Sequence, residues 1–356
     1  MTTTNNATIP AIPALGLGTF RLKGQAVTTS LQRLVTTNGS GPSIGLELPL
    51  DNDWAPSGDT ARRAAERPFG VPDIAQHARL VKLADRLGFR ALWARDVPLY
   101  DPGFGDAAQV FEVFSYLGYL AGVTERILLG TAAVVLPLRE PVLTLKSAGT
   151  IDHLSNGRLM LGVASGDRPV EYPIFERDYA SRGERFREQV AMVRNWGAAT
   201  LPEGIELLPR PAHSLPLLVA GLAQQTPEWI GANMDGCLAY PGTPEDHARR
   251  SAQWRAVAGE HKPYVSFIHL DLADDADAPL ERYRFGGRMG RHALVAELAS
   301  LHAAGVQHVA LHLRHNRRPV DETMEEIGQF VLPEFHAEEA MAARTAKTEI
   351  SEPAVV

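Results

Sequence analysis

The sequence predicts a (β/α)8 barrel, and three observations support this fold class. Eight short runs of apolar and β-branched residues alternate along the chain with eight helical patterns. The chain has 356 residues, which is a sufficient length for one large barrel. No glycine-rich dinucleotide-binding turn follows an early strand, so a doubly wound sheet is the less favoured arrangement.

Each expected strand is a short apolar run that a helical pattern follows. Strands of this kind, buried between a barrel interior and a layer of helices, consist mainly of Val, Ile, Leu and Ala. The expected strands span residues 44–50, 89–95, 127–136, 158–164, 216–220, 236–240, 264–270 and 308–313.

Several of the expected helices have recognisable ends. Residues 73–87 repeat apolar side chains at helical spacing, and Gly88 is placed to end that helix. Pro141 stands at a first-turn position, where its missing N–H has no cost. Ser181 and Glu184 predict a capping box. The remaining helices are expected after the N-caps Thr226 and Thr243 and over residues 106–121, 291–304 and 321–331.

The barrel accounts for most of the chain. We expect an N-terminal extension over residues 1–43, the barrel over residues 44–335 and a disordered tail over residues 336–356. Two connections are long for a barrel, namely residues 166–180 after the fourth strand and residues 271–290 after the seventh. Long loops at the carboxyl ends of the strands are where barrels carry their chemistry.

The composition excludes several classes of protein. The 35 Lys and Arg against 42 Asp and Glu give a net charge of −7, which argues against a nucleic-acid partner. The single cysteine, Cys237, excludes a disulfide framework and a cysteine-based zinc site. No apolar stretch approaches the ~20 residues that span a bilayer, and no signal peptide is recognisable. We therefore expect a cytoplasmic enzyme without a membrane partner.

Alternation along the last strand places polar side chains inside the barrel. Val309 and Leu311 face the helices, which leaves His308, His312 and Arg314 on the inner face, the last two near the mouth. His308, His312 and His315 could be considered as metal ligands, but residues four apart on a strand are separated by ~13 Å, so His308 and His312 cannot share one ion. We expect no metal site.

Other strand ends add polar groups to the same mouth. The alternation places His269 and Asp271 on one face of the seventh strand. Arg95 and Asp96 end the second strand and point to opposite faces. A structural role, as a salt bridge at the barrel rim or a satisfied polar group in the core, would account for each of these residues equally well.

Two further segments suit a flat, anionic ligand. The third strand ends in GTAAVVLP, residues 130–137, whose small side chains let a ligand approach the backbone, although tight packing would favour the same residues. After the fifth strand, residues 220–227 lead into a capped helix whose free N–H groups form an anion site.

Three strings in the chain resemble the bacterial luciferase-like flavin monooxygenase family. They are ADRLGFRALWARDVP, ERILLGTAAVVLPLREPV and IDHLSNGRLMLGVASGD, and the resemblance extends from Ile44 to at least Val331. It implies a TIM barrel that binds reduced FMN, or in one branch a deazaflavin coenzyme, at the carboxyl ends of the strands.

The resemblance also implies positions for the coenzyme. A non-proline cis peptide beside the flavin ring falls on Ala132–Ala133, a phosphate contact falls on Ser165, and a phosphate turn follows the fifth strand. The implied coenzyme-binding residues are Thr131, Ala132, Ala133, Ser165, Gly166, Gly221, Leu222, Gln224 and Gln225.

The resemblance implies fewer positions for catalytic residues than for the coenzyme. Val97 and Pro98 stand where true luciferases have a catalytic histidine pair, so aldehyde-dependent light emission is not expected. Charged groups at the mouth can steer proton transfer. Our candidates for this role are Arg95, Asp96, Asp167 and Arg168.

The preferred interpretation is a two-component monooxygenase. Reduced FMN would come from a separate NAD(P)H:flavin reductase, and the substrates would be O2 and a small organic molecule. The apolar and aromatic helix at residues 106–121 predicts a homodimer. The alternatives are a deazaflavin-dependent hydride-transfer enzyme and a flavin-binding barrel without turnover. Residues 12–31 resemble the start of an aldo-keto reductase, but the catalytic set of that family does not follow.

Overall fold

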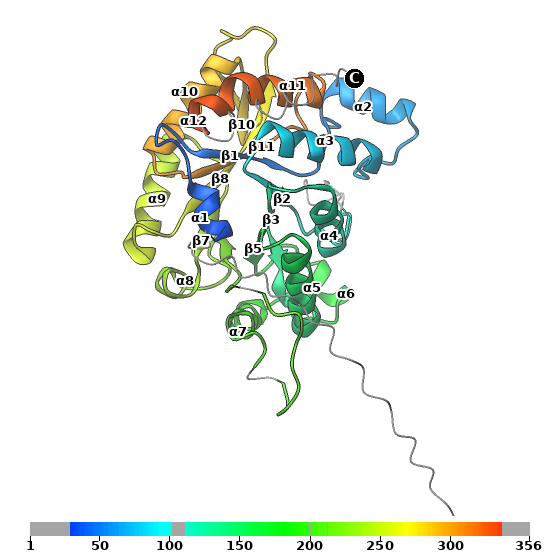
Figure 1. The fold of residues 1–356 in the computed structure, drawn as a ribbon, viewed down its shortest axis with the longest axis vertical. Coiled ribbons are helices and arrows are strands. Elements are labelled where there is room, and N and C mark those ends of the chain that lie inside the picture. The colour runs from blue at the N-terminus through cyan, green and yellow to red at the C-terminus, as the bar shows by residue number, and fades with distance from the viewer. Residues whose placement is uncertain (1–28, 102–110, 199–200, 212, 337–356) are drawn as a thin grey trace, which may run out of the picture.

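The computed structural model describes residues 29–101, 111–198, 201–211 and 213–336, which form a closed parallel barrel inside a layer of helices (Figure 1). The barrel strands are β1 (Ser43–Glu47), β2 (Ala91–Ala94), β3 (Leu128–Thr131), β5 (Leu159–Ala164), β6 (Leu217–Ala220), β7 (Gly236–Ala239), β8 (Tyr264–Leu272) and β11 (His308–His312). Each strand pairs in parallel with the next, and β11 pairs with both β8 and β1 to close the ring. The predicted fold class is confirmed.

All eight predicted strands are present at the predicted places. The last strand before the hairpin, β8, runs to Leu272 and so extends two residues beyond its expected end. The third predicted run is divided into β3 and β4 (Val134–Val135), and a 3-10 turn at Leu136–Leu138 follows. Ala132 and Ala133 lie at the division between the two strands.

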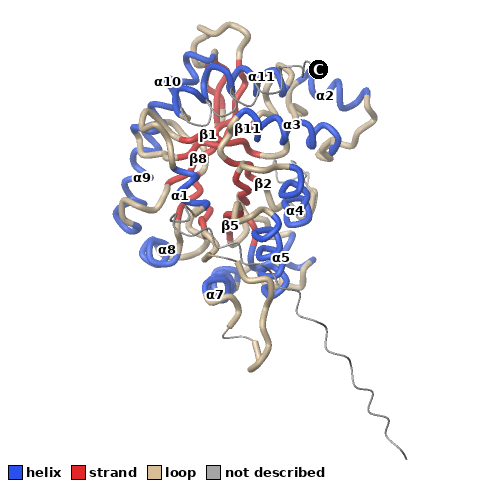
Figure 2. The backbone as a smooth tube through the Cα atoms, viewed as in Figure 1, coloured by secondary structure: helices blue, strands red, loops and turns tan. Residues whose placement is uncertain are grey.

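Most of the helices surround the strands on their outer side (Figure 2), whereas the first lies across one end of the barrel. The helices are α1 (Ser30–Val35), α2 (Pro56–Ala64), α3 (Ile74–Leu87), α4 (Val113–Val123), α5 (Pro141–Leu154), α6 (Glu171–Ile174), α7 (Arg182–Arg194), α8 (Pro227–Asn233), α9 (Pro244–Ala258), α10 (Arg291–Ala303), α11 (Val320–Glu326) and α12 (Leu332–Phe335), with a π-helical turn at Ile327–Val331. None of the described helices combines the length and the apolar character that crossing a membrane requires.

Most of the predicted helix ends are confirmed. The Asp73 side chain accepts hydrogen bonds from the first turn of α3, and Gly88 ends this helix at a φ of +90°. Such a left-handed conformation favours glycine because no Cβ clashes with the backbone. Thr226 caps α8, and Thr243 forms a capping box with Asp246 at the start of α9.

The capping box predicted at Ser181 is wrong. Ser181 is the N-cap residue of α7, but its side chain accepts no hydrogen bond from the helix. Its hydroxyl donates instead to the Asp178 carbonyl oxygen at 3.1 Å. The ψ of 1° at Ser181 differs from the extended conformation that lets a cap side chain reach the first turn.

Some predictions fall wholly or partly outside the described residues. The described part of the helix expected at residues 106–121 is α4, which begins at Val113, and residues 102–110 lie outside the description. Residues 1–28, with most of the stretch that resembles an aldo-keto reductase, and residues 337–356, expected to be disordered, also lie outside it.

The apolar residues form two layers, as the strand alternation predicts. Val309 and Leu311 pack into the large outer layer between strands and helices. Ala310, between them, packs into a smaller cluster inside the barrel. The members of this inner cluster are Leu34, Ala91, Trp93, Leu128, Met160, Leu218, Leu238, Val265 and Ala310.

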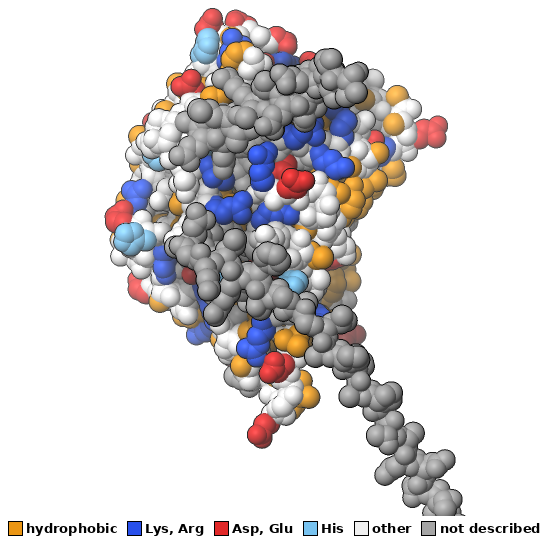
Figure 3. Space-filling view, viewed as in Figure 1, with side chains coloured by type: hydrophobic (Ala, Val, Ile, Leu, Met, Phe, Trp, Pro, Cys, Tyr) orange, Lys and Arg blue, Asp and Glu red, His pale blue; other side chains and the backbone are white. Residues whose placement is uncertain are grey.

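Helix α1 packs against the amino-terminal end of the barrel, which we call the base. Leu34 from α1 belongs to the inner cluster, and the Ser30 hydroxyl donates to the Leu159 carbonyl oxygen at 3.1 Å. Arg90 donates to the carbonyl oxygens of Arg33 and Thr36, on either side of Leu34 in the chain. Lys and Arg side chains gather near the centre of the face shown in Figure 3. The described part of the N-terminal extension therefore seals the base.

Both predicted long connections contain regular structure. Residues 166–180 include α6, and residues 271–290 include a hairpin of β9 (Glu281–Tyr283) and β10 (Gly286–Met289). Strand β10 extends the sheet by pairing in parallel with the end of β8. The sequence does not predict this hairpin because its first strand, Glu-Arg-Tyr, is short and lacks the apolar alternation of a buried strand.

Candidate active site

The carboxyl-terminal end of the barrel, which we call the mouth, has an apolar floor of small side chains. Ala132 and Ala133 are half-buried against the inner cluster, together with Ala220 and Phe267. The peptide bond between Ala132 and Ala133 is cis, as predicted. The Thr131 hydroxyl is buried and donates to the Gly162 carbonyl oxygen at 2.7 Å, so it holds the floor to the next strand.

The exit of β5 is tightly packed beside this floor. Ser165 is buried, and its carbonyl oxygen accepts a hydrogen bond from the Tyr172 hydroxyl. Gly166 follows with a φ of +81°, and a Cβ at this position would lie 2.7 Å from Val135 and 2.8 Å from the Tyr172 hydroxyl. Only glycine therefore fits at this position.

The chain leaves β6, the strand that pairs with β5, in a turn that contains residues in the left-handed conformation. Gly221, Ala223 and Gln224 all have positive φ values, between 45° and 62°. Gln225 is buried, accepts hydrogen bonds from Arg187 and donates to a carbonyl oxygen of α7. Turns of this kind direct successive backbone N–H groups toward one side and form anion-binding concavities. Leu222, at 59% exposed, adds no polar contact.

Arg95 and Asp96 lie in different environments, as the alternation predicts. The Arg95 Nε atom pairs with the Glu47 carboxylate at 2.8 Å, at the inner side of the mouth. Asp96 accepts hydrogen bonds from Arg139 at 2.6 and 2.9 Å and from the Val135 N–H at 3.0 Å. Asp96 thereby ties the loop after β2 to β4, and its oxygens are engaged within the protein.

Asp167 and Arg168 lie in the loop after β5, shortly before Glu171 in the chain. The motifs of the sequence do not indicate a role for the Glu171 carboxylate. Glu171 is 2% exposed, and its Oε1 atom has no partner among the described residues. Burial raises the pKa of Glu171 to about 7, against the opposing effect of Arg168. A carboxyl group with such a pKa can hold or release a proton near neutral pH.

A second polar group lies where β1, β8 and β11 end. Glu47, His269 and His312 each offer a ligand atom, and these atoms lie within 4.8 Å of one another. The two imidazole rings stack with their centroids 4.3 Å apart and an angle of 24° between the planes. Burial lowers the pKa of His312 well below its usual value, so the ring is neutral. We call these three residues the Glu47 cluster.

The prediction that His269 and His312 face the mouth is confirmed, but Glu47 was missed. The sequence contains a signal for it, because Gly45 and Glu47 alternate with the apolar Ile44 and Leu46. In the structure Glu47 stands beside His312 in the strand register, on the same inner face.

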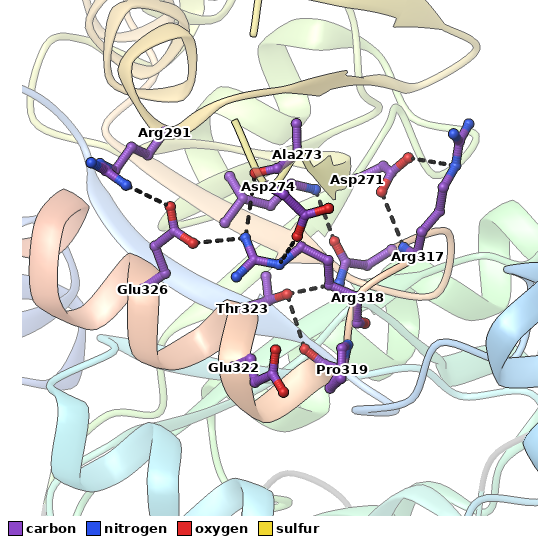
Figure 4. A network of polar contacts seen from close by, with 12 residues as sticks. Asp271, Ala273, Asp274, Arg291, Arg317, Arg318, Pro319, Glu322, Thr323 and Glu326 are labelled. Atoms are coloured by element: carbon purple, nitrogen blue, oxygen red, sulfur yellow. Dashed lines mark hydrogen bonds and ion pairs between the residues drawn. The ribbon is translucent and has the colours of Figure 1, made fainter. Parts of the chain in front are cut away.

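A network of ion pairs fixes the loop that follows β11 (Figure 4). Asp271 accepts a hydrogen bond from the Arg317 N–H at 3.0 Å and pairs with its guanidinium at 3.1 Å. Arg318 pairs with Glu326 at 2.7 Å, and Glu326 also pairs with Arg291 at 3.1 Å. Because the partners come from several elements, this loop is held firmly above the barrel.

A cavity of about 340 Å³ lies away from these groups, outside the barrel. Its walls come from the loop after β1 and from α2, α3 and the start of α11. The arginines that line it are paired with neighbouring carboxylates, as Arg67 is with Asp53 at 2.6 Å. None of the predicted coenzyme or catalytic residues lines this cavity.

Comparisons with known proteins agree with this geometry. The flavin-dependent trigonelline monooxygenase oxygenase component of Acinetobacter baylyi is 32% identical over 122 residues, covering 33% of this chain and 31% of that protein. An F420-dependent glucose-6-phosphate dehydrogenase of Amycolatopsis mediterranei is 24% identical over 193 residues, covering 51% of this chain and 56% of that protein. The chain spans at most about three fifths of the length of the first curated relatives that it matches.

A solved structure shares the fold. The oxygenating constituent of 3,6-diketocamphane monooxygenase from Pseudomonas putida, in complex with FMN, matches with a TM-score of 0.62 and 13% identity, over 82% of this chain and 98% of that one. The family model for luciferase-like monooxygenases matches residues 54–345, which is most of the chain. The chain therefore belongs to the luciferase-like monooxygenase family of oxidoreductases.

Proposed function

We propose that the chain is the oxygenase component of a two-component monooxygenase that uses reduced FMN and O2 on a small organic substrate. The observation that carries the proposal is the floor of small side chains at the barrel mouth, Ala132, Ala133 and Ala220 beside Phe267. A flat ring needs an apolar surface without protruding side chains, and these residues provide one.

The exits of β5 and β6 would hold the coenzyme phosphate. Ser165 and Gly166 end one strand, and the turn of Gly221, Leu222, Gln224 and Gln225 ends its neighbour. The left-handed residues of that turn would present N–H groups to the phosphate, and Arg187 fixes the turn through Gln225. Thr131 would support the ring indirectly, by holding the floor in place.

Bound reduced FMN would supply the two electrons with which O2 yields one oxygen atom for the substrate and one for water. The chain's own part is to exclude bulk water and to move protons. Glu171 can exchange a proton near neutral pH because its pKa is about 7. Arg95 provides a fixed positive charge beside Glu47. Asp96 and Arg139 keep β4 in position.

The comparisons support the two-component arrangement and the coenzyme. The Acinetobacter relative is named an oxygenase component, and by analogy this chain would receive reduced FMN from a separate NAD(P)H:flavin reductase. The Pseudomonas structure, which shares the fold, contains FMN.

Binding of FMN to the purified chain tests the proposal. We expect oxidised and reduced FMN to bind at micromolar concentrations and to raise the melting temperature as the ligand concentration rises. Reductase, NADH and O2 should then support oxygenation of a member of a broad substrate panel. Absence of FMN binding at these concentrations, with a folded protein, would contradict the proposal.

A deazaflavin coenzyme is the second candidate, because the Amycolatopsis relative is named as F420-dependent. The chain would then transfer a hydride and would need no O2. Melting temperatures in the presence of equal concentrations of FMN and the deazaflavin distinguish the two. A larger rise with the deazaflavin would overturn the FMN assignment.

We also propose that the chain forms a homodimer through α4 and α5. The buried aromatic residues of α4, Phe114 and Tyr116, already pack inside the chain, which reduces the apolar surface that the sequence predicts. Tyr119 and Leu143 remain exposed, the latter at 64%. Light scattering should give twice the chain mass, and replacing both residues with Ser should halve it. A monomer mass for the unaltered chain contradicts the proposal.

A further inference from the structure

We propose that the Glu47 cluster binds an uncharged hydroxyl group, and that the substrate is a flat, mainly apolar molecule that carries one. The inference rests on the proposed function only in placing the substrate at the barrel mouth. The binding site itself consists of Glu47, His269 and His312.

His312 is fully buried, yet neither of its ring nitrogens has a hydrogen-bonding partner among the described residues. Every other buried histidine among the described residues has a hydrogen bond at one ring nitrogen at least. His308 is bonded at both nitrogens, to Ser43 and Trp93, and His247 is bonded at both nitrogens by hydroxyl groups. A buried polar atom without a partner destabilises the fold, because it has lost its hydrogen bonds to water and gained none in return. Two such atoms in one ring point to a partner that comes from outside the chain.

The charges around the cluster favour an uncharged partner. The Glu47 carboxylate is paired with Arg95 at 2.8 Å, so its charge is already balanced. An added anion would meet this carboxylate, and an added cation would meet Arg95 and Arg314. The neutral His312 ring has one donor and one acceptor. A hydroxyl group both donates and accepts, so it can bond whichever nitrogen of the ring faces it, protonated or not.

The geometry fits an oxygen atom better than a metal ion. The ligand atoms of the three residues lie within 4.8 Å of one another, and an oxygen that makes hydrogen bonds of ~2.8 Å to three groups spans up to about 4.6 Å between them, so one oxygen can reach the whole cluster. A metal ion with bonds of ~2.1 Å requires ligand atoms about 3–3.5 Å apart. The lone pairs of an imidazole lie in its ring plane, and the stacked, nearly parallel rings of His269 and His312 do not direct them to one point.

The surroundings of the cluster suit a flat apolar body. Trp54 lies with its ring centroid 5.1 Å from that of His312 and 5.0 Å from that of His315. Phe285, from the hairpin, lies 5.8 Å from the ring of His269. His269 is half-buried, so a ligand can reach the cluster past its ring.

Three small probes of equal shape test the inference without a coenzyme. Benzyl alcohol, benzoate and benzylammonium share a phenyl ring and differ in the charge of the polar group. We expect calorimetry on the coenzyme-free chain at pH 7.5 to show binding of benzyl alcohol at least tenfold tighter than of either ion. No binding of the alcohol, or tighter binding of either ion, overturns the inference.

Variants locate the binding. We expect His312→Phe and Glu47→Gln each to weaken benzyl alcohol binding at least tenfold, and His247→Phe, a change of an equally buried histidine whose nitrogens are satisfied, to leave it unchanged. Melting curves establish which variants fold. If His312→Phe does not fold, Glu47→Gln, which keeps the shape of the side chain, carries the test alone. Unchanged binding in a folded variant of the cluster overturns the inference.

Two further measurements separate the possible failures. Zn²⁺ alone is titrated into the chain, and stoichiometric binding that both cluster variants abolish would replace the hydroxyl site by a metal site. FMN is titrated in parallel. If the unaltered chain binds benzyl alcohol but not FMN, the proposed function is refuted and this inference stands. If it binds FMN but not benzyl alcohol, only this inference is refuted.

Discussion

The two buried histidines of β11 lie on the same face of the same strand and have opposite surroundings. His308, at the base, pairs with Ser43 at 2.7 Å and accepts from the Trp93 N–H at 2.9 Å. His312, four residues further along and ~13 Å away, has no such partner among the described residues. Burial is equal in the two cases. Between these two equally buried rings, the satisfied one stabilises the base of the barrel, and the unsatisfied one at the mouth is available to a ligand.

The largest expected effect follows directly from this contrast. His308→Leu should lower the free energy of unfolding by about 2–4 kcal/mol, because it leaves the buried indole N–H of Trp93 without an acceptor, removes one of the two hydrogen bonds of the Ser43 hydroxyl and changes the shape of a packed side chain. His312→Leu breaks no hydrogen bond within the described structure and should cost less than about 1 kcal/mol. Urea unfolding at pH 7.5 measures both.

Equal losses of stability in the two variants would contradict the contrast between base and mouth. A larger loss for His312→Leu would show that its ring is held by the fold rather than kept for a ligand.

Acid should destabilise the chain through its buried neutral histidines. Burial lowers the pKa of His77 and His247 to about 4, below the usual value of 6.5. The unfolded chain therefore binds more protons between these values, and stability is lost as the pH falls from about 6.5 to about 4. For each histidine the pKa shift corresponds to at most about 3.4 kcal/mol of stability. His247→Gln should reduce the slope of stability against pH, and an unchanged slope would contradict this account.

Enlarging the floor should impair coenzyme binding more than folding. Ala132→Leu places three extra carbon atoms where we propose that the flavin ring lies, and should weaken FMN binding at least tenfold, which is ~1.4 kcal/mol. Ala293→Leu, at a half-buried position in the outer layer, is the matched control and should leave binding unchanged. Equal affinities of the two variants would place the ring elsewhere.

Glu171 should have the opposite pH dependence to the histidines. Its pKa of about 7 lies above the usual 4.5, so the folded chain binds the extra proton and stability is lost as the pH rises from about 4.5 to about 7. Glu171→Gln should be more stable than the unaltered chain at pH 8 by about 1 kcal/mol and equally stable near pH 4.5. The exposed Glu176→Gln is the control. A loss of stability at pH 8 would show that the carboxylate is ionised and paired.

Local patterns were sufficient to predict the frame of the barrel. The eight strands are short apolar runs, and their alternation correctly placed His269 and His312 inside the mouth. Capping residues such as Asp73 and Thr243 mark helix ends by hydrogen bonds within one turn. The small side chains at Ala132–Ala133 were recognised because they form a continuous string.

Contacts between segments that are distant in the chain could not be predicted from the sequence. The strand pattern places Asp96 at the mouth, but it does not reveal its partner Arg139, which follows β3 and β4 and is 43 residues away in the chain. Glu171 owes its raised pKa to burial under a folded loop, which no spacing reveals. The hairpin of β9 and β10 depends on pairing with the end of β8 rather than on its own apolar residues.

The most direct test of the central claim is a crystal structure of the chain with FMN. We predict that the flavin ring lies over Ala132 and Ala133 and that its phosphate contacts Ser165 and the turn from Gly221 to Gln225. The face of the ring opposite Ala132 should look toward the Glu47 cluster. Flavin bound in the cavity beside α2 and α3, or a mouth that stays free of flavin at saturating FMN, would contradict the account.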